Sequence, residues 1–198
     1  MKFDLLMVVD MQNDFIDGRL GSEEAEKIVP NVVNIIKSFK EKNIPVVATV
    51  DTHYENNYNR SREGEHLPIR HCIYQTGGWC IEDRVMRALN EKTGLTSFIE
   101  KVDTFGSVDV AELFEPGFSG NFVVVGLCTD LCVLANTVIL QAGHPNAEIY
   151  IVEDACAGST PERHSAALDV LSNMHVNVIS TNDLLDLMKN TPDADNME

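Results

Sequence analysis

The sequence is poor in positive charge. It has 15 lysine and arginine residues against 31 aspartate and glutamate residues, which gives a formal net charge of −16 at pH 7. Nucleic-acid binding needs cationic side chains that displace phosphate counterions, so this composition argues against a nucleic-acid-binding protein, and an anionic membrane surface is disfavoured for the same reason. No apolar run approaches the roughly 20 residues of a membrane-spanning helix, and the first residues lack a signal-peptide cleavage site. We therefore expect a cytoplasmic protein that binds neither nucleic acid nor membrane.

Cysteine is also scarce, with five residues in a chain of 198. An odd count in a chain of this length argues against a disulfide framework and for reduced thiols in a reducing compartment. No internal repeat or low-complexity linker interrupts the chain, and 44% of its residues are apolar. This suits one globular domain with a buried core. We predict a single domain over residues 1–190 and an acidic C-terminal tail over residues 191–198.

Short apolar runs alternate with helical patterns along the chain. We expect strands at residues 3–9, 45–50, 96–100, 121–125, 147–152 and 176–179, and helices at residues 30–42, 81–90, 108–114, 129–142, 161–173 and 181–189. The first helix is predicted to begin at Pro30, because proline suits the first helical position. Residues 52–79 show no clear period and are predicted to form a long surface loop, which in compact domains is usually functional or disordered.

This order of elements predicts an α/β fold. Near-continuous apolar strands joined by helices indicate a three-layer αβα sandwich, with a mostly parallel six-stranded sheet covered on both faces. Ligands in such folds bind outside the carboxyl ends of the strands. Polar or reactive residues follow four of the predicted strands, and we expect them to converge in one crevice: Asp10, Asp51, Lys101 and Cys128 with Cys132.

The most reactive of these residues is predicted to be Cys132. The chain is expected to turn at Gly126 and to place Cys132 in the first turn of a helix, where the helix dipole and free N–H groups lower a thiol pKa and can bind an oxyanion. A carboxylate at Asp10 can accept the thiol proton, and a lysine at Lys101 would stabilise both anions. Taken singly, a packed cysteine, a strand-end cap and a solvated charge are the simpler interpretations.

The long loop adds a candidate metal site. Asp51, His53 and His71 offer a carboxylate and two imidazoles, which can hold a divalent metal with room for water or substrate, and Glu63 is a candidate further ligand. The remaining histidines are expected at the surface: His66, His144, His164 and His175. A flavodoxin-like redox or binding module, with a reversible disulfide between the two cysteines of residues 128–132, is an alternative. No glycine-rich phosphate loop follows the first strand, so nucleotide binding is poorly supported.

Four motifs in order resemble the isochorismatase-like cysteine hydrolase superfamily, and within it the nicotinamidases. They are VDMQNDF at residues 9–15, DTH at 51–53 with LPIRHC at 67–72, EKVDTF at 100–105 and GLCTDLCV at 126–133. The resemblance implies a Rossmann-like fold and an enzyme that hydrolyses the C–N bond of a linear amide. It also implies a catalytic triad of Asp10, Lys101 and Cys132, in which Cys132 is the nucleophile.

The resemblance further implies an oxyanion hole made by the backbone amides of Cys128 and Cys132, with a cis peptide bond between Leu127 and Cys128. It implies one divalent metal ion, zinc with iron and manganese as alternatives, held by Asp51, His53 and His71. Glu63 is the candidate fourth ligand, although one extra residue precedes His71 in this loop. The substrate pocket would be walled by Phe15, Leu67, Trp79 and Phe105, and Leu67 stands where relatives often have an aromatic residue.

The specific expectation is hydrolysis of nicotinamide to nicotinate and ammonia through a thioester, a step of NAD salvage. The alternative within the superfamily is another small amide or carbamoyl substrate. Because the family commonly self-associates, we expect a dimer or tetramer.

Overall fold

The computed structural model describes residues 1–189 and is built on a six-stranded sheet in which each pair of neighbouring strands is parallel. The strands are β1 (Leu5–Val9), β2 (Val46–Thr52), β3 (Thr96–Val102), β4 (Asn121–Leu127), β5 (Glu148–Ala157) and β6 (Asn177–Ile179). Their order across the sheet is β3-β2-β1-β4-β5-β6. After β1 the strands are added toward β3 on one side and, from β4 on, toward β6 on the other. Doubly wound sheets bind ligands at such a switch point, here between β1 and β4.

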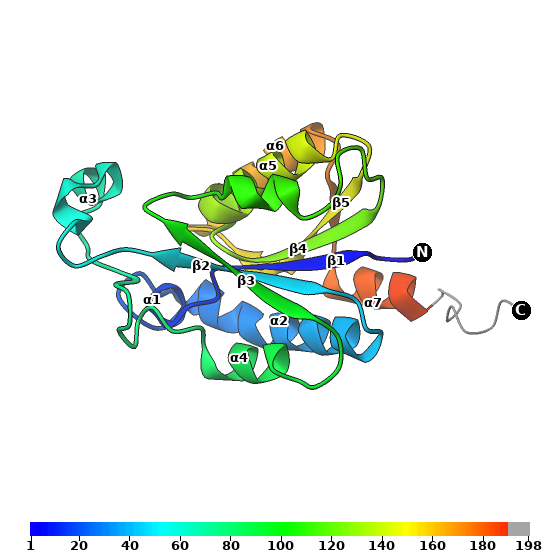
Figure 1. Cartoon of the computed structure of the whole chain (residues 1–198), viewed down its shortest axis with the longest axis horizontal. Coiled ribbons are helices and arrows are strands. Elements are labelled where there is room, and N and C mark those ends of the chain that lie inside the picture. Colours follow the sequence, from blue (N-terminus) through cyan, green and yellow to red (C-terminus); the bar gives the residue numbers. More distant parts are fainter. Residues whose placement is uncertain (190–198) are drawn as a thin grey trace, which may run out of the picture.

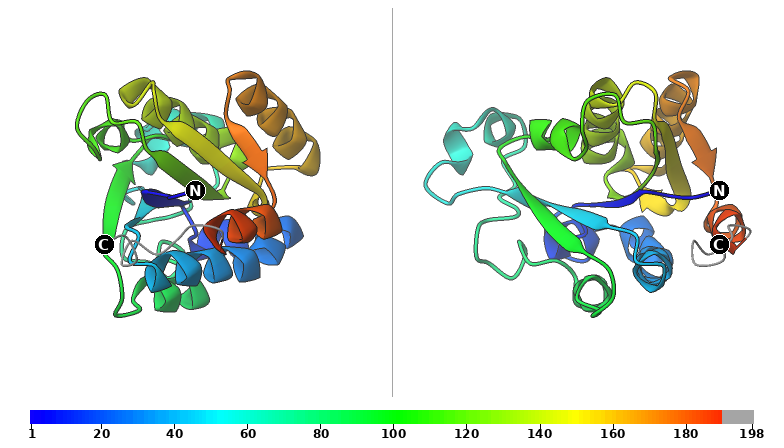
Figure 2. Two further views of the ribbon diagram at one scale, coloured as in Figure 1. Left: turned by 90° about the vertical axis from the view of Figure 1, so that its right-hand side faces the viewer. Right: turned by 45° about the vertical axis from the view of Figure 1, so that its right-hand side comes forward.

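Helices cover both faces of the sheet (Figures 1 and 2). One face carries α1 (Asn13–Ile16), α2 (Glu23–Glu41), α4 (Asp83–Leu89) and α7 (Thr181–Lys189), and the other carries α5 (Leu134–Gly143) and α6 (Pro161–Asn173). Shorter turns are η1 (Tyr58–Arg60), α3 (Arg62–His66), η2 (Val108–Glu112) and the π-helical η3 (Thr129–Val133). The three-layer α/β sandwich expected from the sequence is confirmed, whereas the tail predicted for residues 191–198 lies outside the described residues.

Two apolar cores lie on opposite faces of the sheet. Leu6 and Val8 of β1 pack with the α2 side, whereas Leu5, Met7 and Val9 pack with the α5 side. Every residue of β1 is buried. Both faces of a central parallel strand need apolar side chains, which explains why these strands read as unbroken apolar runs.

Helix α2 begins at Glu23, so the predicted start at Pro30 was wrong. The Ser22 hydroxyl accepts the Ala25 N–H at 3.1 Å and caps the helix. Pro30 lies exposed inside the helix, where it removes a backbone donor. The apolar stripe continues back through Ile28 and Ala25, and burial of this stripe offsets the missing hydrogen bond.

Strand ends also differ from the predicted ones. β5 continues through Glu153 and Asp154 to Ala157, and Lys101 lies inside β3 rather than after it. Gly126 belongs to β4 instead of a turn. Its φ is 119°, and a Cβ there would lie 2.1 Å from the Val9 carbonyl oxygen, so this close approach of β4 to β1 requires glycine.

The segment after β2 is more ordered than a plain surface loop. It contains η1 and α3, and Figure 1 shows α3 beyond the carboxyl end of β2. Tyr58, His71 and Cys72 of this segment are buried. None of the helices within residues 1–189 has the length and apolar character to cross a membrane.

Candidate active site

Asp10, Lys101 and Cys132 meet at the carboxyl edge of the sheet. Asp10 directly follows β1, Lys101 is the sixth residue of β3, and Cys132 lies in η3 after β4. The Lys101 Nζ atom is 2.8 Å from Asp10 Oδ2 and 3.7 Å from Cys132 Sγ. All three side chains are buried. The crevice predicted from the strand ends therefore forms, and the catalytic roles of these residues are part of our proposal below.

The electrostatics of this cluster favour a protonated thiol beside a strong base. Burial and the charge of Asp10 raise the pKa of the Cys132 thiol well above its usual value, against the opposing charge of Lys101. Burial also raises the pKa of the Asp10 carboxyl, again against Lys101. Although burial disfavours an ammonium, the negative charge of Asp10 raises the pKa of Lys101. The thiol thus keeps its proton until a reaction removes it, and Asp10 is a stronger base than an exposed aspartate.

The turn that carries Cys132 is π-helical and precedes α5, which corrects the prediction of an α-helical first turn. The N–H groups of Leu131 and Val133 both donate to the Cys128 carbonyl. The Leu127–Cys128 peptide bond is cis, as expected. Burial raises the pKa of Cys128 to about 12, so acidity does not single out one thiol. The contact with Lys101 distinguishes the two thiols, because the Cys132 sulfur lies 3.7 Å from the Lys101 ammonium.

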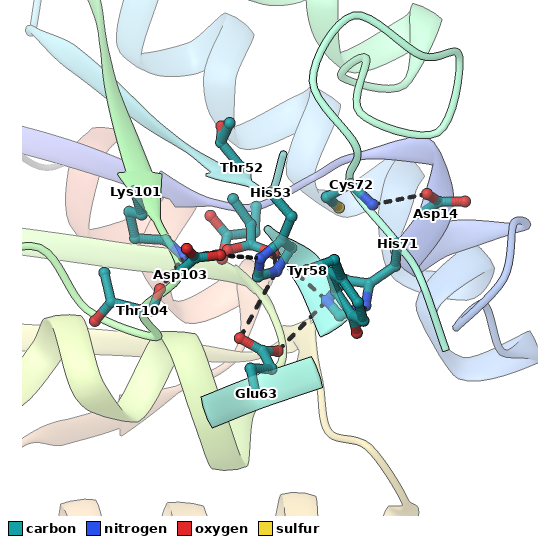
Figure 3. A network of polar contacts seen from close by, with 12 residues as sticks. Asp14, Thr52, His53, Tyr58, Glu63, His71, Cys72, Lys101, Asp103 and Thr104 are labelled. Atoms are coloured by element: carbon teal, nitrogen blue, oxygen red, sulfur yellow. Dashed lines mark hydrogen bonds and ion pairs between the residues drawn. The ribbon is translucent and has the colours of Figure 1, made fainter. Parts of the chain in front are cut away.

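A second cluster of acidic and imidazole groups adjoins this one (Figure 3). His53 Nε2 lies 3.1 Å from Asp51 Oδ2 and 3.7 Å from Glu63 Oε2. His71 Nε2 lies 3.6 Å from Asp51 Oδ2 and 3.4 Å from Glu63 Oε1. In a tetrahedral site with ligand atoms about 2.0–2.1 Å from the metal, neighbouring ligand atoms lie roughly 3.3–3.4 Å apart. The spacing of Asp51, His53 and His71 therefore fits a divalent metal ion, and the Glu63 carboxylate faces both histidines.

The far sides of both imidazole rings are held by other groups. His53 Nδ1 lies 2.7 Å from Asp103 Oδ1, and His71 Nδ1 lies 2.9 Å from the Ile69 carbonyl oxygen and 3.1 Å from the Tyr58 hydroxyl. Both Nε2 atoms thus face the carboxylates. The buried His53 Nε2 atom makes no hydrogen bond within residues 1–189. A buried nitrogen of this kind between carboxylates is a group that a bound cation would satisfy.

The carboxylates of this cluster favour positive charge on the two histidines. Burial alone would lower the pKa of His71, but its hydrogen bonds to Asp51 and Glu63 raise it to about 10. The pKa of His53 is raised in the same way, with Asp51 and Asp103 outweighing burial. Burial opposes ionisation of Asp51, yet the two histidines that face its carboxylate lower the pKa of this carboxyl. The cluster thus attracts positive charge to the two Nε2 positions, which a proton or a metal ion can supply.

A cavity of about 770 Å³ joins the two clusters. Phe15, Leu67 and Phe105 line this cavity, and their role as a substrate wall stays a prediction. Trp79 is not among the lining residues, which corrects its predicted place. Its indole N–H donates instead to Thr52 Oγ1 at 2.9 Å, and its ring packs edge-on against Tyr74.

Two polar residues of the first motif fix the backbone of the candidate metal site. Gln12 is buried, and its side chain bonds both the N–H and the carbonyl of Asp51, at 2.8 and 2.9 Å. Asp14 Oδ2 accepts the Cys72 N–H at 2.8 Å, directly after His71. These side chains position the segments that carry Asp51 and His71. Their places in the motif were visible in the sequence, but their partners, 39 and 58 residues away, were not.

Asn136 is a further site residue that sequence reasoning missed. Its side-chain amide donates to the Cys132 carbonyl at 2.8 Å and to the Phe105 carbonyl at 3.3 Å, and its oxygen accepts the Ser107 N–H at 3.0 Å. The buried amide thus joins the Cys132 turn to the loop that follows Lys101. A polar residue four positions after Cys132 in an apolar helix was the signal that could have found it.

Comparison with known sequences agrees with these observations. A family profile described as Isochorismatase domain matches residues 4–183. A protein of Arabidopsis thaliana described as a probable inactive nicotinamidase is 27% identical over 183 residues, which is 86% of this chain and 89% of that protein.

Solved structures give the same picture. A nicotinamidase/pyrazinamidase from Bacillus subtilis superimposes with a TM-score of 0.75 at 25% identity, covering 90% of this chain and 100% of that one. The pyrazinamidase of Pyrococcus horikoshii in complex with zinc superimposes with a TM-score of 0.73 at 28% identity, covering 89% of this chain and 98% of that one. The N-carbamoylsarcosine amidase of Thermoplasma acidophilum superimposes with a TM-score of 0.69 at 25% identity, covering 91% of this chain and 97% of that one.

Proposed function

The chain belongs to the isochorismatase family and is an amide-hydrolysing enzyme, and we propose that it converts nicotinamide to nicotinate and ammonia with Cys132 as nucleophile. One observation carries this proposal. Cys132 lines the cavity, and its sulfur lies 3.7 Å from the Lys101 ammonium, which in turn lies 2.8 Å from the Asp10 carboxylate. A thiol, a base and a fixed cation are thereby held together beside a space for substrate.

In the first half of the proposed reaction, Asp10 takes the Cys132 proton as the sulfur attacks the amide carbonyl. The C–S bond forms, and the carbonyl oxygen becomes an oxyanion that the backbone N–H groups of Cys128 and Cys132 would bind, worth about 3–4 kcal/mol per donor. Asp10 then gives its proton to the leaving nitrogen. The C–N bond breaks, ammonia leaves, and a thioester on Cys132 remains.

In the second half, water replaces ammonia. Asp10 accepts a proton from the attacking water, the new C–O bond forms, and the C–S bond breaks. The proton returns to the Cys132 sulfur, so one amide and one water give one acid and one ammonia. The charge of Lys101 stabilises whichever of the thiolate and the Asp10 carboxylate is ionised at each stage.

Asp51, His53 and His71, with Glu63 from α3, would hold one divalent ion, for which we expect zinc with iron and manganese as alternatives. A divalent ion bound there supplies a Lewis acid for a pyridine nitrogen or a water molecule. The zinc in the Pyrococcus horikoshii relative supports this expectation. The buried His53 Nε2 atom, which has no hydrogen-bond partner within residues 1–189, also supports it. These residues orient the substrate, while the proton transfers stay with Asp10.

A second candidate substrate is another small amide or carbamoyl compound. The likeness to an N-carbamoylsarcosine amidase and the size of the cavity favour it. The Asp51, His53 and His71 set favours nicotinamide. A homo-oligomer and a place in NAD salvage stay predictions.

The first experiment measures ammonia release from nicotinamide by the metal-loaded enzyme and by the enzyme after chelation. Cys132→Ala should lose turnover by about 10³-fold or more while its circular dichroism spectrum and melting temperature are retained, because no other thiol lies against Lys101. Cys80→Ala is the matched control, since Cys80 is exposed and outside the cavity lining. Turnover that survives in Cys132→Ala would contradict the mechanism. An inactive wild-type enzyme would exclude nicotinamide and lead to the second candidate.

A further inference from the structure

The cavity extends well beyond the two clusters at its base. A volume of about 770 Å³ lies inside the range of roughly 300–1,000 Å³ that holds drug-sized ligands, so a single pyridine carboxamide would fill only part of it. Cys132 and His71 are buried parts of the lining, whereas Arg62 of α3 and Arg163 of α6 are exposed parts of it. The two arginines therefore belong to the mouth of the cavity, and they come from separate elements.

Of the seven arginines in the chain, these two are the ones that line the cavity. Arg70, Arg84 and Arg87 each pair with a carboxylate. Within residues 1–189, Arg62 has no ion pair and Arg163 donates to the Ser159 hydroxyl at 3.1 Å. Arg19 and Arg60 likewise form no ion pair within residues 1–189, but neither lines the cavity, so Arg62 and Arg163 are the arginines whose N–H groups can meet a ligand there. The guanidinium fork fits a planar carboxylate with two hydrogen bonds, so a substrate group can supply the missing anion.

The acidic groups of the same cavity do not cancel this charge. Asp51, Glu63 and Asp103 all face the imidazoles of the metal cluster. Asp130 adjoins the α6 side, where its carboxylate accepts both the N–H and the hydroxyl of Ser159, at 2.7 and 2.6 Å. The Asp130 carboxylate is therefore bonded to Ser159 and forms no ion pair with Arg163. Most N–H groups of Arg163 have no partner within the described residues.

Helix α6 adds to the positive potential at this place. Arg163 is its third residue, and Gly158 and Ser159 just before the helix also line the cavity. The helix has 13 residues, so its N-terminal end carries a partial positive charge directed at the same region. The dipole and the arginine together favour an anion at the mouth.

We propose that Arg62 and Arg163 bind a carboxylate at the far end of the substrate, so that the enzyme also hydrolyses small primary amides that carry a terminal carboxylate. The inference rests on the proposed function for the amide end, where Cys132 forms the thioester and releases ammonia. Water then releases a dicarboxylate. Nicotinamide, which lacks a carboxylate, would use the base of the cavity alone.

The test compares amides of equal length that differ at one end. The substrates are succinamate, glutaramate and adipamate, each paired with its uncharged diamide. We expect kcat/KM of the monoamide to exceed that of the diamide by about 10- to 100-fold at one or more chain lengths, the effect of a charge-assisted hydrogen bond. The ratio should collapse toward one in a chain with both Arg62→Gln and Arg163→Gln. It should persist in Arg84→Gln, an arginine outside the cavity lining.

A binding arm separates this inference from the proposed function. The same ligands are titrated calorimetrically into Cys132→Ala, with and without chelation. Preferential binding of the monoamides that the double arginine variant loses supports the subsite, whereas a wild-type enzyme that turns over nicotinamide but none of the monoamides would overturn the proposed substrate class. A ratio near one at every length, or a preference that chelation abolishes and the arginine variant keeps, would overturn it, while nicotinamide turnover would still support the proposed function.

Discussion

Asp103 shows at the scale of one residue how a side chain can tune a site through its contact with another residue. Its carboxylate holds His53 Nδ1 at 2.7 Å with one oxygen and accepts the Asn57 amide at 3.0 Å with the other. A carboxylate behind a ligand histidine fixes the ring and its tautomer and makes the other nitrogen a better donor. Asp103 is thus a positioning residue for His53.

We predict that Asp103→Ala weakens zinc binding by about 10- to 100-fold, because His53 loses its orientation and part of its basicity. Competition with a chromogenic chelator measures the affinity without any turnover assay. Asp169→Ala removes an exposed carboxylate from α6 and is the control for net charge. Equal zinc affinity in Asp103→Ala and the control would show that Asp103 does not act through the metal site.

His144 gives a prediction about stability. The sequence suggested a surface histidine, but the ring is buried, packs edge-on against Phe114 and Phe122, and makes no hydrogen bond among the described residues. Burial of a polar group without a partner costs about 1–3 kcal/mol. His144→Phe should therefore raise the free energy of unfolding in urea by about 1–2 kcal/mol. A lower value would indicate that a buried water satisfies the ring.

At the scale of the element, α2 shows that a helix can keep an interior proline when its apolar face is large. Pro30 is exposed and has two full turns of helix before it, so its missing N–H is a local defect. The Ser22 cap and the three acidic residues of the first turn stabilise the N-terminal end. The helix forms because tertiary burial outweighs the local preference.

We predict that Pro30→Ala stabilises the protein by about 2–2.6 kcal/mol. The restored hydrogen bond and better helix propensity, together about 3 kcal/mol, outweigh the greater freedom of the unfolded chain, about 0.4–1 kcal/mol. Denaturant unfolding followed by circular dichroism measures the change. Lys37→Ala, at an exposed position of the same helix, should stay within about 0.5 kcal/mol. A destabilised Pro30→Ala would mean that the helix bends at Pro30 to fit the sheet.

At the scale of the whole molecule, the net charge of −16 governs the response to salt. Like charges repel over the compact surface, and salt shortens the range of this repulsion to roughly 8–10 Å near 0.1 M. Exposed ion pairs such as Lys27 with Glu23 contribute little in return.

We predict that the melting temperature of the chelated protein rises by a few degrees between 10 and 200 mM NaCl, because screening relieves repulsion in the folded state. Differential scanning calorimetry measures the shift. Choline chloride should give a similar rise, since screening does not depend on the cation. A rise with NaCl alone would indicate sodium binding at a specific site, and a fall would show that ion pairs dominate.

The chain's own pattern determined the layered α/β fold and the meeting of Asp10, Lys101 and Cys132. Strands that are apolar on both faces must be covered on both faces, and parallel strands all end at one edge, so residues at those ends converge. The motifs of the long loop and their resemblance to a known family predicted Asp51, His53 and His71 as a candidate metal site. Local periodicity and motif order were sufficient for these features because each depends on neighbouring residues and on a topology with few alternatives.

The tertiary structure alone decided the rest. It extended α2 before Pro30, took Trp79 out of the cavity, placed Asp103 behind His53 and brought Arg62 and Arg163 to one mouth. Each of these features depends on contacts between segments far apart in sequence or on the direction in which a side chain leaves the backbone. Neither property has a sequence period, because both are set by how packed layers exclude water and satisfy buried polar groups across the whole chain.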